Sequence, residues 1–202
     1  CALPISHDAP DATLGALLNL IESIGRRESY LALLTAYPQC LDMIAKLASA
    51  SPWAAGYLGQ HPILLDELLD TRRLYAAPDW PAAATSLRAA LDECPGDTER
   101  QMDLLRHFRH ARTFHLAAQD LAGLVKLETL SDHLSDLACI VLGEVLRRAW
   151  AALRTRHRPE PAFAVIGYGK LGGKELGYAS DLDIIFLYDD EAPEAQEVYA
   201  RL

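Results

Sequence analysis

The pattern of hydrophobic residues changes after Pro161, and this change limits the fold more than any other feature of the sequence. Before Pro161, apolar residues recur every three or four positions in segments that proline and glycine separate, which predicts amphipathic helices. After it come two short runs rich in β-branched and aromatic residues, "FAVIGY" and "LDIIFLY", as is typical of strands. We therefore predict a mainly helical, bundle-like chain that ends in the first strands of an α/β domain.

Helical periodicity is clearest in three segments. We predict a helix over residues 98–123, with Thr98 as its N-cap, and a second helix over residues 131–154. A further apolar stripe runs over residues 13–35, with Thr13 in the N-cap position.

Prolines mark the starts of shorter helices, because proline suits the first turn of a helix and breaks its interior. We expect such helices at Pro38, Pro52 and Pro62, and one more near residues 82–92. The chain then divides into a helical segment, a helical bundle region and the start of the α/β domain, over residues 1–60, 61–158 and 159–202.

The composition favours a cytoplasmic protein. The formal net charge is -9, so we expect no broad basic surface for nucleic acid. No segment approaches the roughly 18 apolar residues of a membrane span, and the start lacks the features of a signal peptide. The chain begins without methionine and ends without a helix stop signal, so we expect it to be part of a longer protein. Four scattered cysteines are expected to be reduced thiols: Cys1, Cys40, Cys94 and Cys139.

Residues 164–190, "AVIGYGKLGGKELGYASDLDIIFLYDD", combine a glycine-rich turn with two carboxylates at the start of the second strand. Asp181 and Asp183 are two residues apart, so in a strand they project to the same side. Carboxylates that close repel each other unless a cation lies between them. Mg²⁺ prefers such oxygen ligands, together with the phosphates of a substrate. The pair therefore predicts a divalent metal site.

The residues just before this pair suit a phosphate. Gly172 and Gly173 lack side chains, so backbone N–H groups can approach phosphate oxygens, and Ser180 adds a hydroxyl donor. Lys170 and Lys174 supply local positive charge. We interpret the whole segment as a site for a nucleoside triphosphate with Mg²⁺, used for displacement at phosphorus with paired metals.

Other interpretations of this segment are weaker. Glycines in a turn and aspartates at a strand end are ordinary turn chemistry. Glycines at 167, 169 and 172, with Asp189 or Asp190 further on, imitate a dinucleotide-binding fingerprint. That fold needs a crossover of roughly a dozen residues or more between parallel strands, and "GKELGYASD" is too short to supply it. The same shortness suits an adjacent strand that a tight turn reaches. The P-loop pattern is also absent.

The segment "FAVIGYGKLGGKELGYASDLDIIFLYD" resembles the nucleotidyltransferase signature of the bacterial glutamine synthetase adenylyltransferase family. The resemblance extends upstream through "RRESYLALL", "HPILLDELLD", "RHFRHARTFHLAAQDLAG" and "SDHLSDLA". Full-length members are bifunctional, with one half that attaches AMP and one that removes it by phosphorolysis. "GYGKLGGKELGY" is similar to the C-terminal half, which attaches AMP from ATP to a tyrosine of glutamine synthetase in the regulation of nitrogen assimilation.

The resemblance implies a nucleotidyltransferase domain with a small mixed sheet, whose first part is residues 159–202. By position, Gly172, Gly173 and Ser180 match the phosphate-binding turn, and Asp181 and Asp183 match the first two metal-binding catalytic carboxylates. ATP, glutamine synthetase and a PII-type signalling protein are the implied partners, with Mg²⁺ as cofactor.

A departure from the family pattern limits what this chain can do alone. The family takes a third carboxylate from a later segment resembling "VDxRLRP", which is absent here. We therefore expect the full-length enzyme to transfer AMP, through attack of a tyrosine oxygen on the α-phosphorus of ATP with pyrophosphate leaving, and this chain alone to catalyse little. The alternative is a non-catalytic helical module that docks glutamine synthetase or a PII-type regulator.

Other polar and aromatic residues are expected to pack or to face solvent. His107, His110 and His115 spread over roughly 140° of one helix, so they do not converge on one metal ion. Two groups of arginines read as solvated helix faces, with a docking surface as the alternative: Arg106, Arg109 and Arg112, and Arg147, Arg148, Arg154, Arg156 and Arg158. The three tryptophans are expected in packing: Trp53, Trp80 and Trp150.

Overall fold

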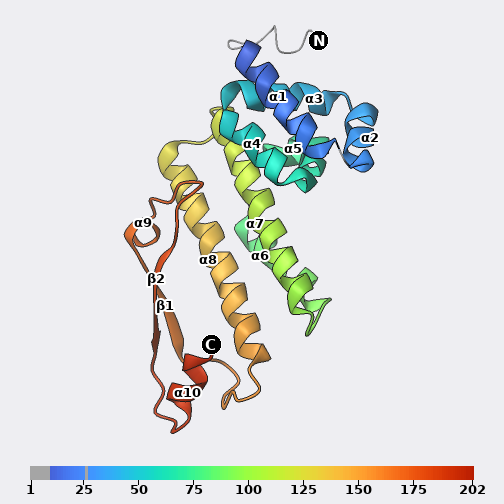
Figure 1. The fold of residues 1–202 in the computed structure, drawn as a ribbon. Coiled ribbons are helices and arrows are strands. Elements are labelled where there is room, and N and C mark those ends of the chain that lie inside the picture. The colour runs from blue at the N-terminus through green and yellow to red at the C-terminus, as the bar shows by residue number, and fades with distance from the viewer. Residues whose placement is uncertain (1–9, 26) are drawn as a thin grey trace. The chain divides into compact units, whose positions relative to one another are not determined.

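The computed structural model of the chain describes residues 10–25 and 27–202 (Figure 1). These residues form two compact units, which we describe separately. The first contains the described residues up to Ala77 together with residues 110–126, and the second contains residues 78–109 and 127–202. Among the described helices, none combines the length and the apolar character needed to cross a membrane.

The first unit consists of helices around one apolar core. Phe114, Ile24 and Leu58 are fully buried in this core, which also takes in Cys40 and Ile44. The helices are α1 (Pro10–Ile24), α2 (Glu28–Ala36), α3 (Gln39–Ala50), α4 (Pro52–Gln60), the 3-10 helix η2 (Pro62–Leu69), α5 (Thr71–Leu74) and the later turns of α7 (Thr98–Leu121).

The prolines start helices here as expected, but the first apolar stripe does not form one helix. Pro52 is the first residue of α4, and α3 begins directly after Pro38. The stripe over residues 13–35 is divided between α1 and α2, because the chain leaves the helix at Gly25, a residue that weakens helices and often ends them. Thr13 is buried inside α1 rather than at its N-cap, since the helix already begins at Pro10.

The second unit contains α6 (Trp80–Asp92), the first turns of α7, α8 (Leu127–Ala152), β1 (Phe163–Tyr168), α9 (Gly169–Gly172), β2 (Asp183–Tyr188) and α10 (Ala195–Ala200). Helix α6 begins two residues earlier than expected, because the Asp79 carboxylate accepts the N–H of Ala82 at 3.0 Å. Asp97 does the same for α7 by accepting the N–H of Arg100 at 2.9 Å, so Asp97 caps the helix and Thr98 is its first residue.

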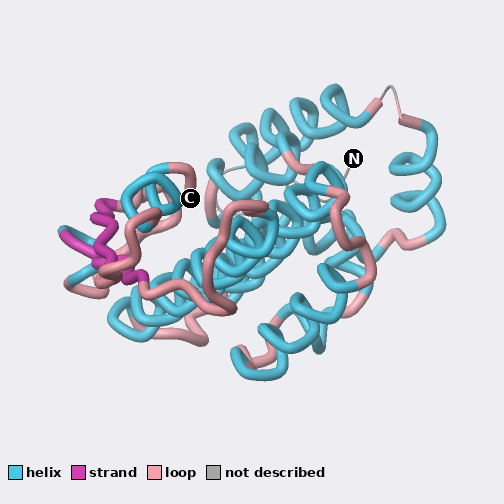
Figure 2. Tube along the Cα trace, turned by 90° about the horizontal axis from the view of Figure 1, so that it is seen from below, coloured by secondary structure: helices cyan, strands magenta, loops and turns pink. Residues whose placement is uncertain are grey.

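The two strands pair antiparallel, with Phe163 opposite Tyr188 and Tyr168 opposite Asp183. This hairpin is the arrangement that the short connection favoured, and it excludes the parallel pair of a dinucleotide-binding fold. We call the end of the hairpin that carries the connection, residues 169–182, its loop end, and the end at Phe163 and Tyr188 its open end. Figure 2 shows that the strands are confined to one part of an otherwise helical chain. A mainly helical chain with a small sheet near its C-terminus is thus confirmed.

Candidate metal and nucleotide site

The residues predicted to bind metal and nucleotide all lie at the loop end of the hairpin (Figure 1). Lys170 and Gly172 belong to α9, the single helical turn that follows β1. Asp183 is the first residue of β2, and Asp181 stands two residues before it, outside the strand, so the expected strand alternation does not apply to this pair. Both carboxylates are exposed to solvent. The fold therefore places the metal-binding and phosphate-binding candidates on one short connection.

Asp183 rests on a glycine that the sequence analysis did not assign to the site. A Cβ atom built on Gly169 would lie 2.4 Å from Oδ2 of Asp183 and 3.4 Å from its Cγ. Gly169 also has a φ of +52°, in the left-handed region that favours glycine. The pairing of Tyr168 with Asp183 brings Gly169, the next residue, under the carboxylate. Gly169 thus supplies a cradle that only a residue without a side chain can form.

The predicted phosphate turn is tightly packed by its own backbone. A Cβ atom on Gly172 would lie 2.6 Å from the carbonyl oxygen of Gly167, so Gly172 is required for the packing of α9 on β1. The N–H of Gly173 donates to the carbonyl of Gly169 at 2.9 Å. Lys174 then adopts a φ of +55°, which turns the chain toward β2. The glycines therefore fix the shape of this turn, in addition to any contact with phosphate.

Ser180 is held with its hydroxyl oxygen as an acceptor. Its Oγ accepts the N–H of Gly177 at 2.9 Å, and its own N–H donates to the carbonyl of Gly177 at 3.2 Å. A hydroxyl that accepts a hydrogen bond keeps its proton for donation. Ser180 can therefore still donate to a phosphate oxygen next to Asp181.

The two carboxylates fit a magnesium ion that a substrate helps to hold. Neither the Asp181 nor the Asp183 carboxylate has a hydrogen-bond or ion-pair partner within the described part of the chain. The same residues contain no group of three or more His, Cys, Asp or Glu side chains that could hold a metal. Mg²⁺ commonly takes one or two carboxylates, with phosphate oxygens and water as its other ligands. The donor set and the cradle at Gly169 agree with that chemistry.

The histidines of α7 pack in the protein, as predicted. The ring of His110 stacks on His61 with centroids 3.7 Å apart, and its Nδ1 lies 2.7 Å from the hydroxyl of Tyr57. His115 pairs with Glu67, with 2.8 Å between Nε2 and Oε2. The His61–His110 stack and the His115–Glu67 pair are separate contacts of the first unit.

Several of the predicted basic residues are engaged in ion pairs rather than free for a ligand. Arg147 donates to both carboxylate oxygens of Glu144, and Arg88 contacts the same carboxylate at 3.0 Å. Arg148 pairs with Asp92 at 2.6 Å. The Arg88–Glu144 and Arg148–Asp92 pairs link α6 to α8, and all of these pairs use charge that a docking surface would need. Trp150 is buried beside α10, in agreement with a packing role.

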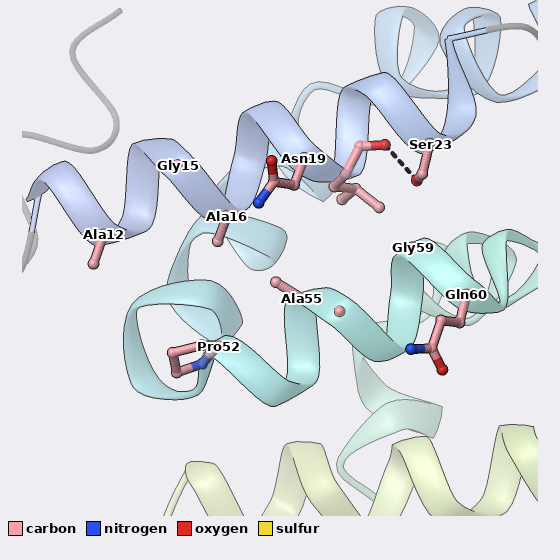
Figure 3. Close-up of a pocket in the computed structure, with 11 residues that line it drawn as sticks. Ala12, Gly15, Ala16, Asn19, Ser23, Pro52, Ala55, Gly59 and Gln60 are labelled. Carbon is pink, nitrogen blue, oxygen red and sulfur yellow. Dashed lines mark hydrogen bonds between the residues drawn. The ribbon is translucent and has the colours of Figure 1, made fainter.

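A separate pocket lies between α1 and α4 in the first unit (Figure 3). Its volume is about 580 Å³, and small residues such as Ala16, Ala55 and Gly59 line most of it. Asn19 and Gln60 contribute amide groups, while the hydroxyl of Ser23 is used by the carbonyl of Leu20 at 2.7 Å. The lining contains no ionisable side chain, so this pocket offers no acid, base or metal ligand.

Comparison with known proteins identifies relatives of this chain. Residues 41–202 match the family described as "Glutamate-ammonia ligase adenylyltransferase". Proteins named "Bifunctional glutamine synthetase adenylyltransferase/adenylyl-removing enzyme" are 62% identical in Chromobacterium violaceum, 59% in Aromatoleum aromaticum and 55% in Nitrosomonas europaea. These alignments cover 95%, 96% and 95% of this chain, and 22%, 21% and 21% of the three relatives. The chain thus spans about a fifth of the length of the curated relatives it matches. Since the family match covers most of the residues, the chain belongs to the glutamate-ammonia ligase adenylyltransferase family.

Proposed function

We propose that this chain is part of an enzyme that transfers AMP from ATP to a tyrosine of glutamine synthetase. The observation that carries the proposal is the pair of exposed, unpartnered carboxylates at the loop end of the hairpin, with Asp183 seated on Gly169. The names of the relatives identify the transferred group as adenylyl and the target protein as glutamine synthetase. Residues 159–202 are then the first part of the nucleotidyltransferase domain, and the helices before them belong to the same enzyme.

Each residue of the site has a definite task in this proposal. Asp181 and Asp183 hold Mg²⁺, and Ser180 donates its hydroxyl proton to a phosphate oxygen. Lys170 adds positive charge to the turn, while Gly172 and Gly173 fix its shape. When bound, the metal neutralises phosphate charge and favours attack at the α-phosphorus. The chain contributes the placement of these groups, on which such a displacement depends.

The remaining features of the proposed enzyme rest on the sequence resemblance, and its double activity also on the name of the relatives. Their name joins adenylyl transfer with adenylyl removal, and we assign this chain to the half that transfers AMP, because of "GYGKLGGKELGY". A third carboxylate comes from a part of the enzyme outside this sequence. We also propose a PII-type signalling protein as a regulator and the cytoplasm as the location.

A docking role for the helical part is the second candidate. Helix α1 leaves three large apolar side chains exposed on its surface: Leu14, Leu18 and Ile21. Exposed apolar groups at helical spacing are typical of a surface that another protein covers. In this role the helices would bind glutamine synthetase or a PII-type regulator without catalysing a reaction.

The test is ATP binding measured by calorimetry with and without Mg²⁺. The parent chain is compared with the double variant Asp181→Asn and Asp183→Asn, and with Asp189→Asn as a matched control. Asp189 is an exposed aspartate just after β2, so the control removes a nearby charge but leaves the proposed site intact. The proposal expects binding that needs Mg²⁺ and is lost in the double variant alone. Equal binding by the double variant and the control would refute it.

A further inference from the structure

A buried carboxylate fixes the open end of the hairpin. Oδ2 of Asp190 lies 2.8 Å from Nε2 of His157, 3.0 Å from Nη1 of Arg158 and 2.9 Å from the hydroxyl of Tyr199. Its Oδ1 accepts the N–H of Ala192 at 3.0 Å. Only 7% of the Asp190 side chain is exposed. We call Asp190, His157, Arg158 and Tyr199 the Asp190 hub.

The hub joins three elements of the second unit. His157 and Arg158 follow α8, Asp190 follows β2, and Tyr199 belongs to α10. The four donors that reach Asp190 therefore come from segments on both sides of the hairpin in the sequence. A buried carboxylate with several donors is expensive to disturb, because each donor would lose a charged acceptor.

Tyr199 extends the hub to both strands. Its hydroxyl oxygen accepts the N–H of Ala162, at 3.0 Å, while its proton goes to Asp190. Its ring stacks on Tyr188 with centroids 4.7 Å apart and on Phe163 at 5.8 Å. Phe163 and Tyr188 are the pair that closes the open end of the ladder. One side chain thus touches the first residue of β1 and the last residue of β2.

The strand that ends at the hub begins with a proposed metal ligand. Asp183 and Asp190 are separated by about 23 Å of extended chain, at about 3.3 Å per residue. The ladder between them is unbroken from Tyr168 and Asp183 to Phe163 and Tyr188, and the N–H of Asp189 continues it to Ala162 at 3.0 Å. A slip by one residue would turn every side chain of β2 to the opposite face. The register set at the open end therefore decides on which face of the hairpin the Asp183 side chain lies.

Apart from its own ladder and the buried Leu171 and Leu176 of the connection, the hairpin has little to hold its register in the described part of the chain. A two-stranded sheet alone is marginally stable in water. Phe186 and Leu187 of β2 are more than half exposed, and Ile185 nearly so. The Asp190 hub and the stacked rings around Tyr199 are the main buried contacts at the open end.

We propose that Asp190 is a positioning residue for adenylyl transfer: it locks the open end of the hairpin, and so holds β2 in the register that places Asp181 and Asp183 for Mg²⁺. This inference rests on the proposed function. Asp190 acts through the strand, and it touches neither nucleotide nor metal.

The experiment compares Asp190→Asn with Asp189→Asn in a protein of the relatives' full length that carries this chain. The two variants make the same chemical change at neighbouring residues, but Asp189 is exposed and lies outside the hub. An asparagine at 190 has one acceptor oxygen for four donors, so it cannot satisfy the hub. The measurements are Mg²⁺ titrations of ATP binding and of AMP transfer, together with hydrogen exchange of the amides of residues 184–188.

We expect Asp190→Asn to raise the Mg²⁺ concentration for half-maximal binding about tenfold, the usual size of effect when the support of a metal ligand is removed. At saturating Mg²⁺ its kcat should return to within about threefold of the parent. Amide exchange in β2 should accelerate about tenfold, while Asp189→Asn matches the parent throughout. If Asp190 contributed only to folding, the fraction of active protein would fall at every Mg²⁺ concentration with an unchanged midpoint. That result would overturn the positioning role.

A second variant protects the test against a failure to fold. Tyr199→Phe keeps the stacked ring and removes only the hydroxyl that bridges Asp190 and Ala162, so we expect a midpoint shift in the same direction. An unchanged midpoint in Tyr199→Phe and Asp190→Asn would refute the inference while leaving the proposed function intact. A parent protein that binds ATP equally with and without Mg²⁺ would refute the proposed function itself.

Discussion

Replacing Gly169 by alanine should damage the metal site far more than it damages the fold. The new Cβ would lie 2.4 Å from Oδ2 of Asp183, a separation that real contacts do not allow. To reach an ordinary contact the carboxylate must retreat by about 1 Å. Because it is the end of a short flexible side chain, it can do so by rotation, and the backbone of β2 need not move.

The energetic consequences differ for stability and for metal binding. An alanine at a φ of +52° costs roughly 1 kcal/mol in the left-handed region. Rotation of Asp183 away from its preferred conformation adds about 0.5–1.5 kcal/mol at most. Metal ligands, however, tolerate shifts of only about 0.2 Å, so a carboxylate displaced by about 1 Å should weaken Mg²⁺ binding about 10- to 100-fold.

Gly96 provides a matched control in the same unit. Its φ is +78°, and a Cβ built on it meets nothing within 4 Å, so Gly96→Ala has the backbone strain without the clash. Urea unfolding should show a loss of roughly 1 kcal/mol for Gly96→Ala and about 1.5–2.5 kcal/mol for Gly169→Ala, in which Asp183 must also rotate. Calorimetric titration of Mg²⁺ in the presence of ATP should show the loss of affinity in Gly169→Ala alone. Equal binding of Mg²⁺ and ATP by the two variants would show that the room at Gly169 does not matter for the metal site.

Three further changes test other parts of the second unit. Glu144→Gln should lower the free energy of unfolding by about 1–2 kcal/mol in urea titrations, because the buried side chain loses the charge that pairs with the half-exposed Arg88 and Arg147. Glu160 is exposed, so Glu160→Gln serves as a control that should have little effect. The N–H of Ala192, with His157, Arg158 and Tyr199, holds the pKa of Asp190 well below its usual range. A lowered folded-state pKa stabilises the fold above the unfolded value of about 3.9 and loses this effect as the pH falls toward the folded value, so parent and Asp190→Asn should differ most at neutral pH and converge in acid. Gly143→Ala should raise stability by about 0.5–1 kcal/mol, measured by thermal unfolding, since the position lies inside α8 with open space around it.

The features that local chemistry determines could be predicted from the sequence, while helix limits often could not. The helix starts at Pro38, Pro52 and Pro62 follow from the fixed φ of proline, although spacing did not reveal that Pro62 opens a 3-10 helix. Helix α8 begins four residues before the predicted start, and the first three residues of that turn are exposed, with 71% of the surface of Leu127 free. A search for buried periodicity misses such a turn, even though Glu128 near the N-terminus favours it.

Some residues of the site could likewise be assigned from the local sequence, whereas others depend on contacts between the strands. Ser180, Asp181 and Asp183 could be assigned because they stand together in one turn of sequence. Gly169 could not, since its contact with Asp183 exists only through a hydrogen-bonded register in which Tyr168 faces Asp183. The sequence also allowed Gly169 to be part of a dinucleotide-binding fingerprint. The antiparallel pairing of the strands excludes that interpretation.

The same register explains why the site needs two supports rather than one. At the loop end, Gly169 leaves room for the Asp183 carboxylate but sets no limit on how the strands slide. At the open end, the Asp190 hub prevents sliding but leaves the side chain of Asp183 free to rotate. A change at either end should therefore weaken Mg²⁺ binding by a different route. Gly169→Ala should accelerate hydrogen exchange in residues 184–188 by no more than its loss of global stability accounts for, whereas Asp190→Asn should accelerate it beyond that amount. If the two variants altered exchange in the same way, the orientation of the Asp183 carboxylate and the register of β2 would not be set separately at the two ends of the strand.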